Sequence, residues 1–166
     1  MQINNIHIRR YRDADFDEVS ALFRHTIRTV NLADYTAEQC AAWIDKSQGL
    51  RLRRAQLAQW NTQVAERDGK IVGFGSIDAQ GCLEMLYVHA AYMRQGIAGA
   101  LCDVLEKDFD CIATDASVTA QPFFLRRGYV VCAQQTVDCG GVSLCNACMQ
   151  KSATVLADSD PIERAR

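Results

Sequence analysis

The sequence predicts a single mixed α/β (α+β) domain in which helices flank a central sheet that is mainly antiparallel. At 166 residues and 18.5 kDa, the chain can form one sizeable core and is too short for two ordinary domains. Hairpin-like strands run from 62 to 89, and a strand, a helix and a returning strand follow at 111–138. We expect the domain to span residues 1–151 and the polar, aperiodic residues 152–166 to form a mobile tail.

The first third of the chain predicts one strand and two helices. Residues 3–10 alternate as a strand, and the next segment predicts a helix that Asp13 or Asp15 can cap. A second helix begins at Thr36, which fits a capping box with Gln39. The polar stretch 46–59 predicts a short helix or a loop. The apolar face of the first helix consists of residues at three- and four-residue spacing, namely Phe16, Val19, Leu22, Phe23, Ile27 and Val30.

The rest of the chain changes to a strand-like period. Strands at 62–66 and 70–77 are joined by the turn pair Asp68-Gly69, and a second turn at 78–81 leads into a strand at 82–89. A glycine-containing turn then opens a helix over 96–107. A strand at 111–116, a helix at 119–127 that Gly128 ends, and two strands at 129–138 and 142–150 complete the domain.

Composition and charge exclude several classes of protein. The net charge of −2 gives no electrostatic footprint for a nucleic acid or an anionic membrane. No apolar run approaches the roughly 18 residues of a membrane span, and the start of the chain lacks the apolar region of a signal peptide. We therefore expect a cytoplasmic protein whose partner is small, with no nucleic acid and no membrane involved.

Eight cysteines invite a metal or redox interpretation. Cys145 and Cys148 form a Cys-x-x-Cys pair near Cys139, a spacing typical of zinc and disulfide-exchange sites. They fall in a predicted strand, where residues three apart point to opposite faces. Other cysteines lie in apolar runs, where a free thiol acts as a small hydrophobe. We expect packed thiols and no metal, with a metal or redox module as the less favoured alternative.

The turn at 94–100 predicts an anion site. A strand that passes through a glycine turn into a helix presents unpaired amides at the positive end of the helix dipole. Gly96 and Gly99 would keep side chains away from those amides. The alternative is that glycine and alanine only allow close packing of the helix on the sheet. The turn is neither a P-loop nor a dinucleotide-binding turn.

Two segments resemble a known family. Residues 83–101, LEMLYVHAAYMRQGIAGAL, resemble the acetyl-CoA-binding strand and pyrophosphate loop of the GNAT superfamily of N-acetyltransferases. Residues 115–129, DASVTAQPFFLRRGY, are similar to the family's later helix, and the combination most resembles the YafP-like bacterial branch. The resemblance covers residues 3–150. It implies a GNAT-like fold whose sheet splays apart beside Val88, with acetyl-CoA as co-substrate and no metal.

The activity that the resemblance implies is acetyl transfer to a primary amine of a small molecule or a peptide. An alternative is a fold that binds acyl-CoA without turnover, as a sensor or partner-binding module. The acceptor and the oligomeric state stay open, with a homodimer as one option.

The resemblance also implies cofactor contacts. Backbone groups of Leu86, Tyr87 and Val88 would pair with the pantetheine arm as with an added strand. Met93 stands where the family usually has Gln or Arg, Ser117 where many members have Asn, and Phe124 where many have Tyr. Ser117 could hydrogen-bond the cofactor, whereas Phe124 could only pack against it. The pyrophosphate would be held by the loop amides of Arg94, Gln95, Gly96, Ile97, Ala98 and Gly99, with Arg94 adding a charge.

Acetyl transfer requires a neutral amine and a leaving thiolate. Many relatives protonate the thiolate with the tyrosine that Phe124 replaces. Tyr87 and Tyr129 are candidate substitutes, although a thiol pKa of about 8.5 also allows solvent to suffice. Glu84 is the first candidate base. It interrupts an apolar strand and is expected to share a face with Leu86 and Val88, where partial desolvation would raise its pKa.

Each of these candidates has a structural alternative. Glu84 could instead be a carboxylate paired with an arginine. His89 is the second candidate base or an exposed turn residue. The acceptor is expected against the first two helices, where Tyr35, Trp43 and Trp60 either line the cleft or belong to the core.

Overall fold

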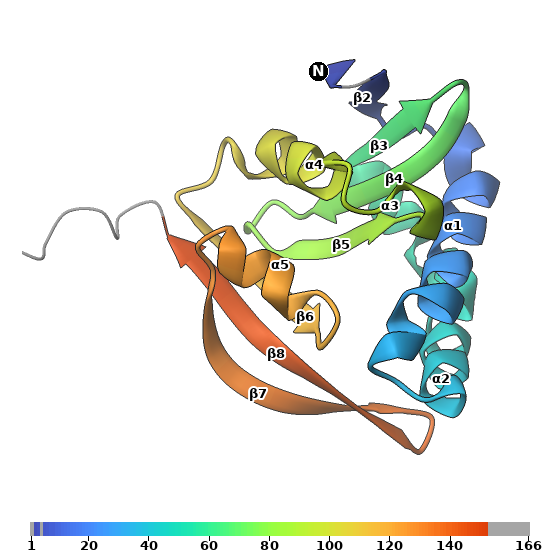
Figure 1. The fold of residues 1–166 in the computed structure, drawn as a ribbon, viewed down its shortest axis with the longest axis vertical. Coiled ribbons are helices and arrows are strands. Elements are labelled where there is room, and N and C mark those ends of the chain that lie inside the picture. The colour runs from blue at the N-terminus through green and yellow to red at the C-terminus, as the bar shows by residue number, and fades with distance from the viewer. Residues whose placement is uncertain (1, 4, 153–166) are drawn as a thin grey trace, which may run out of the picture.

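Two antiparallel sheets form the framework of the protein, which a computed structural model describes over residues 2–3 and 5–152 (Figure 1). The expected tail lies outside the described residues from 153 onward. The mainly antiparallel arrangement is confirmed, but the predicted central sheet is divided between β5 and β6. The first sheet has the order β1 (Gln2–Ile3), β2 (Ile6–Arg10), β3 (Asn61–Arg67), β4 (Lys70–Ile77), β5 (Leu83–Val88). The second has the order β6 (Cys111–Ser117), β8 (Val142–Ser152), β7 (Val130–Cys139).

The two sheets meet at one end of β5 and β6. These strands are joined by a single parallel bridge between Cys82 and Ala113. The Ala113 amide donates to the Gly81 carbonyl at 3.0 Å, and Thr114 Oγ1 donates to the Leu83 carbonyl at 2.8 Å. Beyond this point no ladder joins the two strands within the described residues, because β6 pairs with β8 on its other side. The sheet therefore opens toward Val88, as expected.

Within the described residues, the α-helices that cover the sheets (Figure 1) are α1 (Phe16–Thr29), α2 (Ala37–Ser47), α3 (Arg54–Gln59), α4 (Ile97–Glu106) and α5 (Gln121–Arg126). The core contacts show that α1 and α4 lie on opposite faces of the first sheet. Val64 packs in the cluster that contains the apolar face of α1, whereas its neighbour Ala65 packs with α4. Burying Phe23 and Ile27 of α1 contributes about 1.5–3 kcal/mol each relative to exposed side chains.

Two glycines of β4 set the position of α4. A Cβ atom at Gly73 would lie 3.0 Å from Ile97 Cγ2, and one at Gly75 would lie 2.8 Å from Leu105 Cδ1. Since real Cβ atoms do not tolerate the shorter distance, the missing side chains allow α4 to approach the sheet closely. This close packing places the N-terminus of α4 beside the end of β5.

The structure tests the predicted helix starts. Thr36 Oγ1 accepts from the Gln39 amide at 3.1 Å and Gln39 Oε1 accepts from the Thr36 amide at 2.9 Å, so the capping box is confirmed. The expected aspartate cap of α1 is wrong. Asp15 makes no capping bond to α1; its carboxylate pairs with Arg9 at 2.7 Å and accepts from the Arg12 amide at 2.8 Å, at the start of the 3-10 turn Asp13–Asp15 that precedes α1.

The stretch 46–59 holds a 3-10 turn at Gln48–Arg53 followed by α3. Among the described helices, none combines the length and hydropathy needed to cross a bilayer.

Candidate active site

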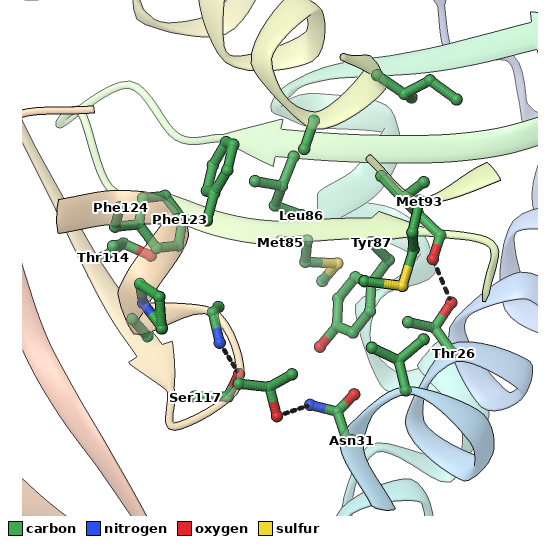
Figure 2. A pocket seen from close by; sticks show the side chains of 18 of the residues that line it. Thr26, Asn31, Met85, Leu86, Tyr87, Met93, Thr114, Ser117, Phe123 and Phe124 are labelled. Carbon is green, nitrogen blue, oxygen red and sulfur yellow. Dashed lines mark hydrogen bonds between the residues drawn. The ribbon is translucent and has the colours of Figure 1, made fainter. Parts of the chain in front are cut away.

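A cavity of about 470 Å³ opens where the two sheets separate (Figure 2). Its walls come mainly from β5, the loop before α4, the β6–α5 connection and α1. Leu86, Val88, Arg94 and Ser117 are among the predicted cofactor residues that line it. The divided sheet thus gathers residues from four separate parts of the chain at one site.

The edge of β5 that faces the cavity has no partner strand. The His89 amide donates to the Val72 carbonyl of β4 at 2.9 Å, and the Tyr87 carbonyl lies 3.2 Å from the Cβ position of Gly73. Because backbone groups alternate in direction along a strand, those of Leu86 and Val88 point away from β4, toward the cavity. Of the three residues predicted to pair with pantetheine, Tyr87 therefore offers its side chain rather than its backbone.

The loop before α4 has a backbone suited to an anion. Arg94 and Gly96 have φ of 59° and 83°, and α4 begins at Ile97. Within the described part of the chain, the amides from Arg94 to Gly99 donate to no recorded acceptor. A Cβ atom at Gly96 would have nothing within 4 Å. These free amides at a helix start can receive a phosphate.

The remaining predicted cofactor residues divide into two groups. Ile97, Ala98, Gly99, Ser117 and Phe124 line the cavity. Gln95 does not, because its Oε1 accepts from Arg67 Nη1 at 2.9 Å on the outside of the loop. Only its backbone remains available to an anion.

Sequence reasoning missed some lining residues. Arg126 of α5 and Thr26 of α1 reach the cavity, the latter donating from Oγ1 to the Val88 carbonyl at 3.2 Å. Arg126 adds a second cation to the cavity wall that also contains Arg94. No local sequence pattern marks either residue, because the fold alone brings α1 and α5 to the end of β5.

Glu84 lines the cavity on a face other than the predicted one. Ile77 pairs with Leu83 and Ser76 with Met85, so Glu84 is the extra residue of a β-bulge. The bulge turns Leu83 toward the same cluster as Leu86, while Met85 packs with α1. The expectation that Glu84 shares a face with Leu86 and Val88 is therefore wrong.

The surroundings of Glu84 are only partly buried. Its side chain is 32% exposed, and Oε2 accepts from Arg53 Nη1 at 3.2 Å. The structure combines both readings of this residue, since the carboxylate lines the cavity and also pairs with an arginine. An ion pair of this exposure contributes about 0–1 kcal/mol, so a substrate can displace Arg53 at little cost.

His89 is held at the end of β5 by other contacts. Its Nδ1 accepts from the Ala91 amide at 3.2 Å, and its ring stacks on His25 with centroids 4.1 Å apart. Burial and the neighbouring His25 lower the pKa of His89. His89 is not among the residues that line the cavity.

Tyr129 belongs to a different part of the molecule. It is 2% exposed and donates its hydroxyl to Glu106 Oε1 at 2.9 Å. Arg127 and Lys151 also bind Glu106, at 3.0 and 2.9 Å. Burial raises the pKa of Glu106, but these hydrogen bonds outweigh it and hold the pKa below its usual value. Tyr129 does not line the cavity, because its hydroxyl completes this buried network.

The side chain of Tyr87 lies in the cavity. Its ring meets Phe23 edge-on at 5.0 Å and stacks against Phe74 at 5.3 Å. Figure 2 shows the hydroxyl directed across the cavity toward the segment of Ser117. Burial raises the pKa of Tyr87, so the phenol stays protonated at neutral pH.

The aromatic residues expected near an acceptor have separate roles. Trp43 lines the cavity, and Trp60 packs beside the main core. Tyr35 is 6% exposed; its hydroxyl donates to the Cys145 carbonyl at 2.6 Å and accepts from the Val118 amide at 2.9 Å. Tyr35 therefore connects the segment after α1 to the second sheet.

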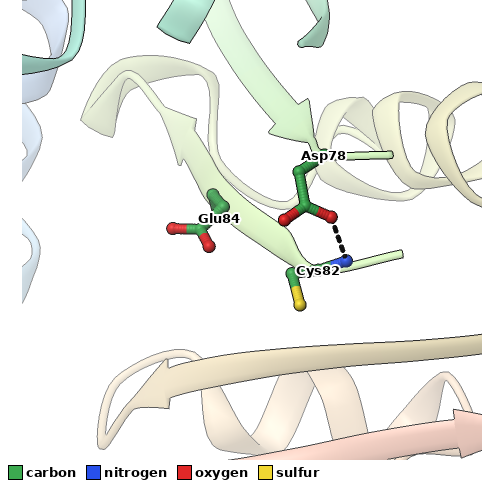
Figure 3. Close-up of side chains that lie close together, drawn as sticks. All are labelled: Asp78, Cys82 and Glu84. Carbon is green, nitrogen blue, oxygen red and sulfur yellow. Dashed lines mark hydrogen bonds between the residues drawn. The ribbon is translucent and has the colours of Figure 1, made fainter. Parts of the chain in front are cut away.

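Asp78, Cys82 and Glu84 form a group of potential metal ligands, whose ligand atoms lie within 4.8 Å of one another (Figure 3). Asp78 Oδ1 already accepts from the amides of Gln80 and Cys82, at 2.8 and 2.9 Å. Glu84 pairs with Arg53. This group can be explained by a turn and an ion pair, and the expected lack of a metal stays a prediction.

The Cys-x-x-Cys pair lies on β8, as expected. Cys145 is opposite Thr136, and Cys148 is opposite Ala133. Because both cysteines lie in a strand, three residues apart, the chain between them does not form the tight turn that holds a metal ion in a zinc knuckle.

All eight cysteines are free thiols, and five of them are buried or half-buried as expected. The expectation of packed thiols is wrong for Cys111, Cys132 and Cys145, which are exposed because they lie on the outer faces of β6, β7 and β8.

Comparisons with known proteins agree with this geometry. The profile of the acetyltransferase (GNAT) domain matches residues 31–151. The uncharacterized N-acetyltransferase YafP of Escherichia coli K12 is 35% identical over 150 residues, which cover 89% of this chain and 97% of YafP.

Solved structures show the same similarity. A GCN5-related N-acetyltransferase from Rhodopseudomonas palustris is 32% identical with a TM-score of 0.84, covering 92% of this chain and 98% of that one. PaiA N-acetyltransferase from Thermoplasma acidophilum, in complex with coenzyme A, shares the fold at 17% identity and a TM-score of 0.69, covering 89% and 98% of the two chains. The chain belongs to the GNAT family of acetyltransferases.

Proposed function

We propose that this protein transfers the acetyl group of acetyl-CoA to a primary amine of a small molecule or a peptide. The observation that carries the proposal is the unpaired edge of β5, which leads directly into the free amides at the start of α4. A pantetheine arm has amides that can pair with such an edge, and a diphosphate is the anion that suits a helix start. Few other small molecules offer both groups in this order.

The cofactor contacts follow from the directions of the backbone groups. Leu86 and Val88 would pair with the pantetheine amides, with the Val88 carbonyl using the lone pair that Thr26 Oγ1 leaves free, and the amides from Arg94 to Gly99 would bind the diphosphate. Arg94 and Arg126 would supply positive charge at the phosphate end of the cavity. Ser117 and Phe124 would form the opposite wall.

The acceptor would enter on the α1 side of β5. There Glu84 would take a proton from the ammonium group, directly or through a water molecule, and release the neutral amine for attack. Displacing Arg53 from Glu84 would free the carboxylate for this role. His89 and Tyr129 have no place in the proposal, because neither lines the cavity and the Tyr129 hydroxyl donates to Glu106 in a buried network.

The cellular setting is proposed on chemical grounds. The eight free thiols fit a reducing compartment, so we place the protein in the cytosol. The surface charge is nearly balanced, which fits a small-molecule or peptide acceptor better than a nucleic acid.

The test begins with calorimetric titration of CoA and acetyl-CoA into the purified protein. Released thiol is then measured with acetyl-CoA and a panel of amines that includes diamines, amino acids, amino sugars and peptides with free N-termini. We expect micromolar binding of both nucleotides and thiol release with at least one amine. Absence of binding would reject the proposal, and binding without thiol release would favour a sensor.

A further inference from the structure

The hydroxyl groups of the cavity wall differ in whether their protons already have a hydrogen-bond acceptor. Thr26 Oγ1 donates to the Val88 carbonyl at 3.2 Å and Thr114 Oγ1 donates to the Leu83 carbonyl at 2.8 Å, so both protons are committed to the backbone. Ser117 Oγ accepts from the Ala120 amide at 3.2 Å. Within the described residues, the hydroxyl of Tyr87 has no recorded hydrogen-bond acceptor. Tyr87 can therefore donate its proton to a ligand.

Tyr87 also carries a phenol, which is a stronger acid than the aliphatic hydroxyls of serine and threonine. A phenol has an ordinary pKa of about 10, well below that of an aliphatic alcohol such as Ser117. Tyr92, a second phenol that lines the cavity, lies in the 3-10 turn Ala90–Tyr92 just before the phosphate-binding loop. Only Tyr87 projects from β5 itself.

Packing fixes the ring of Tyr87 before any ligand binds. Phe74 stacks on one side at 5.3 Å with an interplanar angle of 19°, and Phe23 meets the ring edge-on. The hydroxyl points into the cavity on the side of Ser117 (Figure 2). A donor held in this way loses little side-chain entropy when it meets an acceptor atom.

The position of Tyr87 places it beside the expected path of the thioester. Leu86 and Val88, its neighbours in the chain, are the residues whose backbone groups face the open edge of β5. Phe124, on the opposite wall, has no hydroxyl. This step rests on the proposed function, which runs the pantetheine arm along that edge.

We infer that the Tyr87 hydroxyl donates a hydrogen bond to the sulfur of CoA and stabilises the thiolate as it leaves. The amine nitrogen forms the new C–N bond, and the electron pair of the C–S bond moves to sulfur. The proton of the nitrogen passes to Glu84 or water. Tyr87 keeps its own proton while sharing it with sulfur, and a solvent proton then converts the thiolate to CoA.

The charges near Tyr87 are consistent with a protonated donor. The charges that act on Tyr87 are those of Arg53 from the 3-10 turn, which also pairs with Glu84, and of Tyr35 from the segment after α1. Burial raises the pKa of Tyr87 more than Arg53 lowers it. The phenol therefore remains protonated over the range in which a thiol of pKa about 8.5 ionises.

The inference can be tested without knowing the acceptor. Dissociation constants of CoA and desulfo-CoA are measured by calorimetry at pH 6.5 and 9.5 for the wild-type protein, Tyr87→Phe and Tyr92→Phe. At pH 9.5 the CoA thiol is largely ionised, and a hydrogen bond from Tyr87 to a thiolate is stronger than one to a neutral thiol. We therefore expect the affinity for CoA to rise about tenfold or more from pH 6.5 to pH 9.5, relative to the change for desulfo-CoA. Desulfo-CoA corrects for other titrating groups such as His89.

We expect Tyr92→Phe to keep this gain and Tyr87→Phe to lose it. Tyr87→Phe retains the ring that packs on Phe23 and Phe74, and its binding of desulfo-CoA at pH 6.5 reports that it is folded. A wild-type protein without the gain, or a Tyr87→Phe protein that retains it, would overturn the inference. Failure of the wild-type protein to bind either nucleotide would reject the proposed function instead.

Discussion

Replacing Gly96 by glutamate tests where the phosphates of the cofactor bind. Gly96 has φ of 83° and precedes the first residue of α4. The ideal Cβ position has no atom within 4 Å, so the new side chain would project into open space at the mouth of the loop. There a carboxylate would meet the diphosphate with like charge.

The structure separates two energies in this variant. A side chain in the left-handed region costs about 1–2 kcal/mol of folding stability, which corresponds to a fall of about 2–8 °C in Tm. Repulsion at about 4 Å from each of two phosphate charges costs about 1 kcal/mol per charge in water and about 4 kcal/mol nearer the protein. The total of at least about 2 kcal/mol weakens CoA binding by about 30-fold.

Calorimetry with CoA measures the binding energy, and thermal unfolding measures the strain. Gly140→Glu is the matched control, because Gly140 has φ of 65° and nothing within 4 Å in the distant β7–β8 turn. It should lose similar stability and bind CoA as the wild-type protein does. Gly96→Ala introduces the strain without the charge. A folded Gly96→Glu protein with wild-type affinity would show that the phosphates bind elsewhere.

Three further predictions concern other parts of the molecule. Glu84→Gln should keep CoA affinity but lower turnover by about 10²–10⁴-fold and alter the acidic limb of the pH–rate profile, measured with an acceptor from the amine panel; near-normal turnover with an unchanged limb would remove Glu84 from the mechanism. Glu106→Gln should lose about 3 kcal/mol in denaturant unfolding, because it removes the buried carboxylate that Arg127 and Lys151 share and leaves Arg127 only the more exposed Asp103 as a charge partner. The pKa of Glu106 is lowered on folding, so its contribution is present above the unfolded-state value of about 4.3 and is lost as pH falls through the folded value. The wild-type Tm should therefore drop more steeply in acid than that of Glu106→Gln, and equal slopes would contradict this account. Gly75→Ala should lose about 1–3 kcal/mol in the same unfolding assay, because its Cβ atom would press on Leu105 at 2.8 Å; an unchanged stability would mean that α4 is free to shift.

Features with local causes could be predicted from the sequence. The apolar period of α1, the capping box at Thr36 and the glycine turn before α4 each depend on residues within one or two turns of each other. The hairpins at 62–89 follow in the same way from turn residues and alternation. The resemblance to the family likewise depends on contiguous segments, residues 83–101 and 115–129.

The bulge at Glu84 could not be predicted in this way. Apart from Glu84, all residues from Leu83 to Val88 are apolar or aromatic, so the regular and the bulged register both bury apolar side chains. The pattern contains no signal that selects between them. The partner strand β4 makes that choice, through its pairing with Leu83 and Met85.

The roles of tyrosines and histidines also depend on distant residues. Tyr129 finds its partner Glu106 on α4, and His89 stacks on His25 of α1. A phenol or an imidazole in a sequence does not reveal which of many polar groups the fold will bring to it. The roles of Tyr35, Tyr87 and Tyr129 differ because their hydroxyls meet different groups in the folded structure.

The hydrogen bonds of Tyr35 bear on the mechanics of the cleft. Among the described residues, β5 and β6 are hydrogen-bonded to each other near Cys82 and not at the Val88 end. The width of the cavity at the Val88 end therefore depends on hydrogen bonds made by α1 and its following segment. Tyr35 supplies one such tie to the second sheet, and Asn31 Nδ2 adds another by donating to Thr119 Oγ1 at 3.2 Å. Thr26 Oγ1 of α1 also donates to the Val88 carbonyl of β5, so α1 and its following segment are hydrogen-bonded to both walls of the opening. A molecule that inserts between the strands meets walls of preset spacing, and little free energy is spent on reorganising them.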